Sequence, residues 1–194
     1  TALAEGKICY IEDWVYEEFY ENVLSASVYD CKGTDLKVIY TPLNGTGNIP
    51  VREILSRKGI ENVSVVKEQE LPDGNFPTCP FPNPEIKQVF ELAIEMGNAQ
   101  DADLLLATDP DCDRVGIAVK NGDEYVLFTG NQTGALLVKF VLEMKKAKLS
   151  SKSTLVKTIV TSELGADIGR SYGLQCEDTL TGFKYIGDKI NKYE

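Results

Sequence analysis

Three aspartates alternate in the short stretch ATDPDCDRVG, at residues 107–116. Asp109, Asp111 and Asp113 would repel one another at close range, and each would disfavour ionisation of its neighbours. A divalent cation with oxygen ligands, Mg²⁺ or Ca²⁺, neutralises such a cluster. Arg114 follows directly, and an arginine beside a cation is useful when both contact the same phosphate. The stretch therefore predicts a site for a hard metal ion and a phosphoryl group.

Two other interpretations of this stretch differ in how well the residues fit them. A calcium loop with a similar opening needs a glycine at its sixth position and a glutamate near its twelfth. Counted from Asp109, these positions hold Arg114 and Lys120, which excludes that loop. A solvated acidic turn without function remains the alternative. Cys112 is interpreted as a bystander, because thiolates suit softer metals than oxygen ligands do.

Two glycine-containing turns also follow predicted strands and precede predicted helices. The segment TPLNGTG, at 41–47, could bring backbone N–H groups to an anion or could be a tight turn only, and both interpretations stay open. The segment TGFK, at 181–184, would offer a phosphate the N–H groups of Gly182 and Phe183 together with the Lys184 ammonium. The alternative for Lys184 is an ordinary solvated side chain.

The composition excludes several classes of function. The chain of 194 residues contains no histidine, so a histidine-based triad, a zinc–histidine site and a histidine general base are all excluded. A formal net charge of −10 argues against nucleic acid or an anionic membrane as a partner, and no apolar run is long enough to span a bilayer. Five scattered cysteines without a CxxC pair indicate reduced thiols, so we expect a cytoplasmic protein.

The elements that must position these residues alternate between strands and helices. The pattern predicts strands within 36–42, 62–68, 102–108, 114–120, 125–128, 153–162 and 174–180, and helices within 11–26, 48–58, 83–96, 130–147, 163–173 and 183–193. Asn83 is the expected cap of the third helix, and Gly97 is expected to end it. The unbroken apolar run at 104–107 indicates a strand buried on both faces, and ligands bind beyond the carboxyl ends of such strands.

This alternation predicts the α/β class, with two similar three-layer α/β/α domains and mixed, parallel-rich sheets. We expect the first domain, with the aspartate loop, at residues 1–125 and the second at 126–194. The last predicted helix runs to the end of the sequence, so we expect the second domain to be truncated.

Five motifs, taken together and in order, identify the chain as a member of the α-D-phosphohexomutases, on the phosphoglucomutase/phosphomannomutase side. They are TPLNGTGN, PDGNFPTCPFPNPE, ATDPDCDRVGIAV, GNQTGALL and LTGFKYIGDKI, and they cover essentially the whole chain. The resemblance implies the second domain and most of the third of a four-domain enzyme.

The resemblance also implies a mechanism. A phosphoserine on the first domain donates its phosphoryl group to a hexose monophosphate, and the resulting hexose 1,6-bisphosphate turns over and returns its other phosphate. By this likeness Asp109, Asp111 and Asp113 hold Mg²⁺, Arg114 orients the phosphoryl group, and Lys184 lies near the sugar phosphate. The partners are then a phosphorylated sugar and domains 1 and 4, whose phosphoserine, sugar and phosphate motifs this sequence lacks. Without them we expect no turnover.

The sequence departs from the family pattern at three positions. Asn44 stands where the family often has histidine, and Pro110 and Cys112 replace the usual glycines between the aspartates. Within the family, a phosphopentomutase or a sugar-bisphosphate synthase is the alternative, because the sugar-reading loop is missing. Outside it, the alternatives are a non-catalytic metal- and anion-binding module and an aspartate-nucleophile phosphatase. Such a phosphatase needs a threonine or a similar residue at the position of Asp113, which counts against this alternative.

Overall fold

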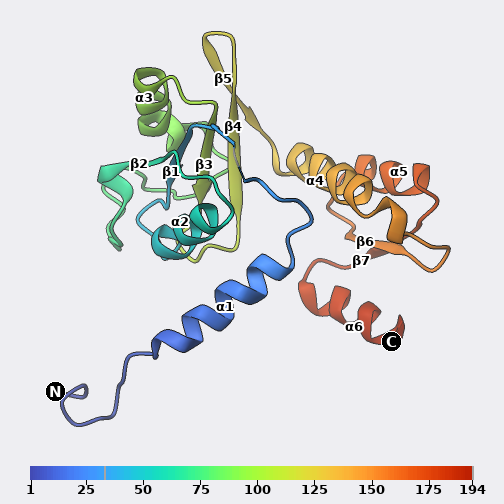
Figure 1. Cartoon of the computed structure of the whole chain (residues 1–194), viewed down its shortest axis with the longest axis horizontal. Helices are drawn as coiled ribbons and strands as arrows, with labels where there is room; N and C mark the ends of the chain where they lie inside the picture. The colour runs from blue at the N-terminus through green and yellow to red at the C-terminus, as the bar shows by residue number, and fades with distance from the viewer. Residues whose placement is uncertain (33, 194) are drawn as a thin grey trace.

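The computed structural model describes residues 1–32 and 34–193, which form two units with separate sheets (Figure 1). The first unit contains α1 (Asp13–Ser25), β1 (Val38–Thr41), α2 (Asn48–Arg57), β2 (Val63–Val65), α3 (Glu91–Gln100), β3 (Leu104–Thr108), β4 (Val115–Asn121) and β5 (Glu124–Phe128), with short 3₁₀ helices η1 (Lys67–Gln69) and η2 (Lys87–Phe90). The second contains α4 (Gly130–Met144), η3 (Lys146–Lys148), β6 (Thr154–Thr158), α5 (Glu163–Ser171), β7 (Gln175–Thr179) and α6 (Phe183–Tyr193).

The first sheet has five strands in the order β2-β1-β3-β4-β5. Strands β2, β1 and β3 are parallel, and Tyr40 of β1 pairs with Leu106 of β3. Strands β4 and β5 form the antiparallel hairpin expected around Asn121–Asp123, which extends the sheet at one edge (Figure 1). Every residue of β1 is buried, as the apolar sequence of a central strand requires. The predicted α/β class with a mixed, parallel-rich sheet is confirmed.

The core of the first unit lies between this sheet and α3, which packs against β1 and β3. Its buried members are Ile39, Leu43, Val66, Cys79, Val89, Phe90, Ala93, Ala102, Leu105, Ala107 and Ala118. Cys79 and Val89 come from the proline-rich segment and the 3₁₀ helix after it, so this long connection is packed onto the core. The core fixes β1 and β3 side by side, and their carboxyl ends therefore meet at one edge.

The third helix begins and ends later than the sequence indicates. Asn83 does accept a hydrogen bond from the Glu85 N–H, at 3.0 Å, but Ile86 is extended and the helix starts only at η2. Gly97 does not end α3, which continues to Gln100 and closes at Asp101 with φ +55. Gly97 is a packing position, because an added Cβ would lie 2.8 Å from the Tyr125 hydroxyl and 2.9 Å from a Leu105 methyl carbon.

The second unit has two parallel strands, β6 and β7, in its described part, with α4 and α5 packed side by side and α6 against β6 (Figure 1). The chain enters this unit through Thr129, which follows β5 directly. Its hydroxyl accepts a hydrogen bond from the Gln132 N–H at 3.3 Å, and the Gln132 side chain accepts one from the Thr129 N–H at 2.9 Å. This reciprocal capping box fixes the first turn of α4. Residue 125, the boundary expected from the sequence, lies inside β5.

Helix α1 lies away from the sheet and packs against α2 (Figure 1). The Arg57 guanidinium joins them, with both terminal nitrogens 2.8 Å from the Glu17 carboxylate oxygens and its centre 4.7 Å from the centre of the Tyr20 ring. Most apolar side chains of α1 remain exposed. Among the described residues, none of the helices has the length and apolar character needed to cross a bilayer.

Candidate active site

The aspartate loop, residues Asp109–Arg114, connects the carboxyl end of β3 to the start of β4. Asp109 is almost fully buried, whereas Asp111 and Asp113 are exposed. One carboxylate oxygen from each lies within 4.8 Å of the other two. Around Mg²⁺, with bonds of about 2.1 Å, adjacent ligand oxygens are about 2.9 Å apart and opposite ones about 4.2 Å, so the three carboxylates must move closer together to bind one ion. Three carboxylates are also the donor set that a hard divalent cation prefers.

Arg114 holds Asp109 in place through two different donors. The Arg114 backbone N–H donates to Asp109 Oδ1 and the side-chain Nε–H donates to Oδ2, both at 2.8 Å. Each carboxylate oxygen can accept more than one hydrogen bond or ligand. The two bonds from Arg114 therefore orient Asp109 and still leave both of its oxygens able to bind a metal ion. Within residues 1–32 and 34–193, the two terminal nitrogens of Arg114 have no hydrogen-bond partner. The fork of the guanidinium is therefore available to a phosphoryl group.

The pKa values of two aspartates move in opposite directions. Burial, the largest influence, raises the pKa of Asp109, but the backbone and side-chain hydrogen bonds from Arg114, with its charge, help to bring it below its ordinary value. The negative charge of Asp111, the largest influence, and that of Asp109 raise the pKa of Asp113. Repulsion within the cluster thus raises the pKa of Asp113, one of its two exposed members, and a bound cation would relieve it.

Cys112 is in the left-handed region, with φ +62. This conformation costs an ordinary side chain about 1–2 kcal/mol and costs glycine almost nothing. The position therefore suits glycine, the residue that the resemblance to the α-D-phosphohexomutases implies there. The Cys112 N–H donates to the Asp109 carbonyl at 2.9 Å, so the cysteine closes the same tight turn.

Two buried hydroxyls, those of Tyr40 and Thr108, lie next to the aspartate loop. Tyr40 Oη and Thr108 Oγ1 lie 2.8 Å apart, and burial raises the pKa of Tyr40 well above its usual range, so the phenol stays protonated. Gly47 lies directly against them, since an added Cβ would be 2.6 Å from the Tyr40 oxygen and 2.9 Å from Cys112 Sγ. Neither Tyr40 nor Thr108 was predicted as part of the site, because no local sequence pattern marks them.

The segment TPLNGTG is a tight turn against the protein, and most of its N–H groups already donate within the protein. Those of Asn44, Gly45 and Thr46 donate to the carbonyls of Gln69, Pro42 and Pro110. These three N–H groups are therefore not available to an anion, which argues against an anion-binding turn at these positions. The Asn44 side chain is buried and donates to the Glu68 and Leu71 carbonyls, which is a structural role.

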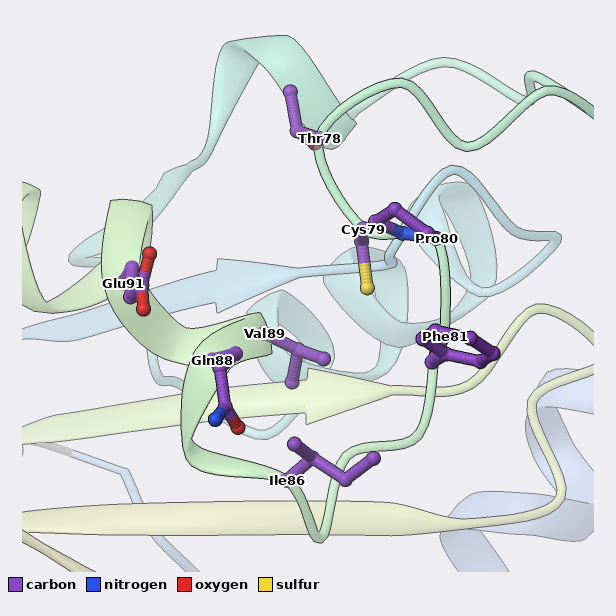
Figure 2. Close-up of a pocket in the computed structure, with 8 residues that line it drawn as sticks. All are labelled: Thr78, Cys79, Pro80, Phe81, Ile86, Gln88, Val89 and Glu91. Carbon is purple, nitrogen blue, oxygen red and sulfur yellow. The ribbon is translucent and has the colours of Figure 1, made fainter.

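An open depression of about 550 Å³ lies beside the aspartates. Its lining includes Phe81, Asn83, Asp109, Asp111 and Arg114. A second depression, of about 480 Å³, shares Phe81 and Ile86 with it, and the Cys79 sulfur points into the space near Val89 (Figure 2). Asp109, Asp111 and Arg114 thus border a depression next to a second one, and Phe81, which lines both, is largely exposed.

Gly182, Phe183 and Lys184 lie in the second unit, where β7 leads into α6. Gly182 has φ +127, and Phe183 and Lys184 are exposed at the first turn of the helix. The Lys184 ammonium lies 5.1 Å from the centre of the Tyr185 ring. No hydrogen bond or ion pair among the described residues joins these three residues to the aspartate loop, so the structure shows two separate groups of candidate residues.

The two units match two consecutive domain models of one family. The model described as phosphoglucomutase/phosphomannomutase, alpha/beta/alpha domain II matches residues 17–122, and that of domain III matches residues 129–194. The first match ends in the turn between β4 and β5, and the second begins at Thr129, the capping residue of α4.

Individual relatives carry the same family names. A phosphoglucomutase from Staphylococcus saprophyticus is 40% identical over 189 residues, which is 95% of this chain and 33% of the relative. A Haemophilus influenzae protein named "Probable phosphomannomutase" is 36% identical over 164 residues, 84% of this chain and 33% of its own. The chain therefore spans about a third of the length of these curated relatives.

A solved structure shows the same fold. The phosphoglucomutase/phosphomannomutase family protein from Burkholderia thailandensis matches with a TM-score of 0.70, at 20% identity, over 92% of this chain and 36% of that protein. At this identity the likeness shows the fold alone. The two domain models and the longer relatives show more: this chain is a member of the phosphoglucomutase/phosphomannomutase family and corresponds to its second and third α/β/α domains.

Proposed function

We propose that this chain is the metal-holding central part of a magnesium-dependent phosphoglucomutase/phosphomannomutase, which interconverts hexose 1-phosphate and hexose 6-phosphate through a hexose 1,6-bisphosphate. One observation carries the proposal: three aspartate carboxylates converge beside an arginine whose guanidinium is anchored at Nε and unpaired at its fork among the described residues. The relatives are about three times as long as this chain, so turnover is a property of the whole enzyme.

The three carboxylates would hold the ion, and their oxygen-only chemistry fits Mg²⁺. When bound, the ion neutralises the negative charge that builds on a transferring phosphoryl group. Asp109 would keep a fixed position because Arg114 binds both of its oxygens. The Arg114 fork would contact two phosphoryl oxygens and align the group with the attacking hydroxyl.

Lys184 would bind the second phosphate of the sugar. It is exposed in the first turn of α6, where the helix dipole and the ammonium both favour an anion. The phosphoryl donor, a phosphoserine, and the loops that read the sugar would come from domains outside this chain. Glucose and mannose phosphates are the candidate substrates, because the family name includes both.

The proposal is tested in the longest natural gene product that contains residues 1–194. We expect Asp111→Asn to lower kcat for glucose 1-phosphate at least about 100-fold, because one of three charged ligands is lost. Excess EDTA should abolish activity, and added Mg²⁺ should restore it. Glu95→Gln, an exposed acid on α3, is the matched control and should leave kcat unchanged. Normal turnover of the Asp111 variant in EDTA would contradict the metal assignment.

A further inference from the structure

The segment Pro42–Gly47, here called the glycine segment, joins β1 to α2 and lies against the middle of the aspartate loop. The Thr46 N–H donates to the Pro110 carbonyl at 2.8 Å, and the Thr46 hydroxyl donates to the same oxygen at 3.1 Å. Pro110 stands between Asp109 and Asp111, and the bonded carbonyl belongs to the peptide unit that leads into Asp111. Two hydrogen bonds from a segment 64 residues away therefore fix the backbone between two proposed metal ligands.

The close approach of the two backbones depends on Gly45. An added Cβ at this position would lie 2.6 Å from the Pro110 oxygen and 2.8 Å from its carbonyl carbon, well inside van der Waals contact. Both contacts are to backbone atoms, so no side-chain rotation relieves them. Any side chain at position 45 must push the aspartate loop and the glycine segment apart.

The glycine segment is also anchored on its far side, so it does not yield easily. The Asn44 backbone N–H donates to the Gln69 carbonyl at 2.9 Å, and its buried side-chain amide donates to the Leu71 carbonyl at 2.9 Å. The Asp73 N–H donates to the Asn44 carbonyl at 3.2 Å. A side chain at position 45 would therefore mainly displace the aspartate loop, in which Asp111 and Asp113 are exposed.

We propose that the glycine segment is a positioning element, which sets the separation of Asp109 and Asp111 by holding the Pro110 carbonyl and so favours Mg²⁺ over the larger Ca²⁺. The inference rests on the metal site of the proposed function. Mg²⁺ requires a near-ideal octahedron with short bonds, whereas Ca²⁺ accepts longer bonds and irregular geometry. A shift of the loop should therefore weaken Mg²⁺ binding more than Ca²⁺ binding.

The test uses the full chain, residues 1–194, and compares Gly45→Ala with Gly74→Ala. Gly74 lies in the same unit, and nothing is within 4 Å of an added Cβ there. Mg²⁺ and Ca²⁺ affinities are measured by competition against Mn²⁺, with spin resonance as the readout. We expect Gly45→Ala to weaken Mg²⁺ binding about tenfold or more, as is typical for residues that support metal ligands, and to weaken Ca²⁺ binding clearly less. Gly74→Ala should match the wild type.

A second pair of variants keeps the test decisive if Gly45→Ala fails to fold. Thr46→Val removes one of the two bonds to Pro110, and Thr46→Ser keeps it. We expect the valine variant to shift the Mg²⁺/Ca²⁺ ratio in the same direction by a few fold, and the serine variant to restore it. Circular dichroism and urea unfolding identify variants that are only destabilised.

Hydrogen exchange gives a readout without metal. The Cys112 and Arg114 N–H groups both donate to Asp109 and report on the loop. Their exchange should accelerate about tenfold in Gly45→Ala, while amides of β1 and β3 keep their protection. Unchanged exchange, or an equal loss of affinity for both ions, would overturn the positioning role. A wild-type chain that binds neither ion contradicts the proposed metal site instead, and the exchange result then still decides whether the segment positions the loop.

Discussion

Arg114 binds one carboxylate, that of Asp109, through both its backbone and its side chain, and both contacts are 2.8 Å long. The backbone contact would survive any substitution at position 114, whereas the Nε contact and the free fork belong to arginine alone. Lysine keeps the charge but has neither an Nε donor nor a planar fork. Two functions are assigned to Arg114, orienting Asp109 and contacting a phosphoryl group. A lysine at this position tests whether they depend on more than the positive charge.

Arg114→Lys in the longest natural gene product should lower kcat/KM about 10- to 100-fold, since a hydrogen bond to a charged group is worth about 1.5–3 kcal/mol. Mn²⁺ affinity should change much less, because the three carboxylates remain. Steady-state kinetics and metal titration measure the two effects. The control is Arg52→Lys on α2, whose contacts to Asn48 and Glu70 lie outside the candidate site. Equal losses of metal affinity and kcat/KM would assign Arg114 to metal binding only.

Lys184→Ala in the same gene product should reduce kcat/KM in both directions of the reaction, because a phosphate occupies the start of α6 whichever end of the sugar reacts. A charged contact of this kind predicts a loss of about tenfold. Metal affinity should be unaltered, because Lys184 lies in the other unit. Lys192→Ala, in the last turn of α6, is the control. Wild-type kinetics for the Lys184 variant would mean that this lysine is an ordinary solvated side chain.

Two glycines inside helices should respond oppositely to alanine. Gly97→Ala gains about 1 kcal/mol of helix propensity, but the new methyl would displace Tyr125, whose hydroxyl donates to the Ala102 carbonyl at 2.6 Å. Overpacking costs about 1–3 kcal/mol and a lost hydrogen bond about 1 kcal/mol more, so after the gain in propensity we expect a net destabilisation of roughly 1–3 kcal/mol. Gly134→Ala meets no atom within 4 Å and should stabilise α4 by about 0.5–1 kcal/mol. Urea unfolding measures both, and changes of the same sign would refute the packing role of Gly97.

The ion pair between Lys157 and Glu163 predicts a pH dependence in the second unit. Their charged atoms are 2.7 Å apart, and the hydrogen bond from Lys157 is the main reason that the pKa of Glu163 lies below its ordinary value of 4.5. A carboxyl whose pKa is lower in the folded state stabilises the fold fully above its unfolded pKa, and this contribution is lost as pH falls through the folded value. Glu163→Gln should therefore lower the urea midpoint at about pH 7 and have little effect at about pH 3.

The control for this prediction is Glu95→Gln, an exposed glutamate that forms no ion pair among the described residues. It should leave the midpoint unchanged at both pH values. A Glu163→Gln effect of the same size at both pH values would show that the lost interaction is not the charged pair.

The sequence predicts those parts of the fold that depend on local chemistry. The apolar run at Leu104–Ala107 becomes a central strand, and Asn121–Asp123 becomes a hairpin turn, because both follow from neighbouring residues. The prediction that Gly97 ends the helix is wrong, because the environment of Gly97 is set by Tyr125, 28 residues further along the chain, and not by the helix itself. The convergence of the three aspartates was expected from their alternation, whereas the Thr46–Pro110 contact has no local signal.

The capping box at Thr129 has a mechanical consequence for the two units. Strand β5 ends at Phe128 and α4 begins at Gly130, so the pivot between sheet and helix is the single residue Thr129, with φ −70 and ψ 158. Both reciprocal bonds with Gln132 form only near these dihedral angles. Swinging one unit against the other at this point must first break the cap, at a cost of about 1 kcal/mol. The cap therefore favours one angle at this joint, whereas a flexible tether has no preferred angle.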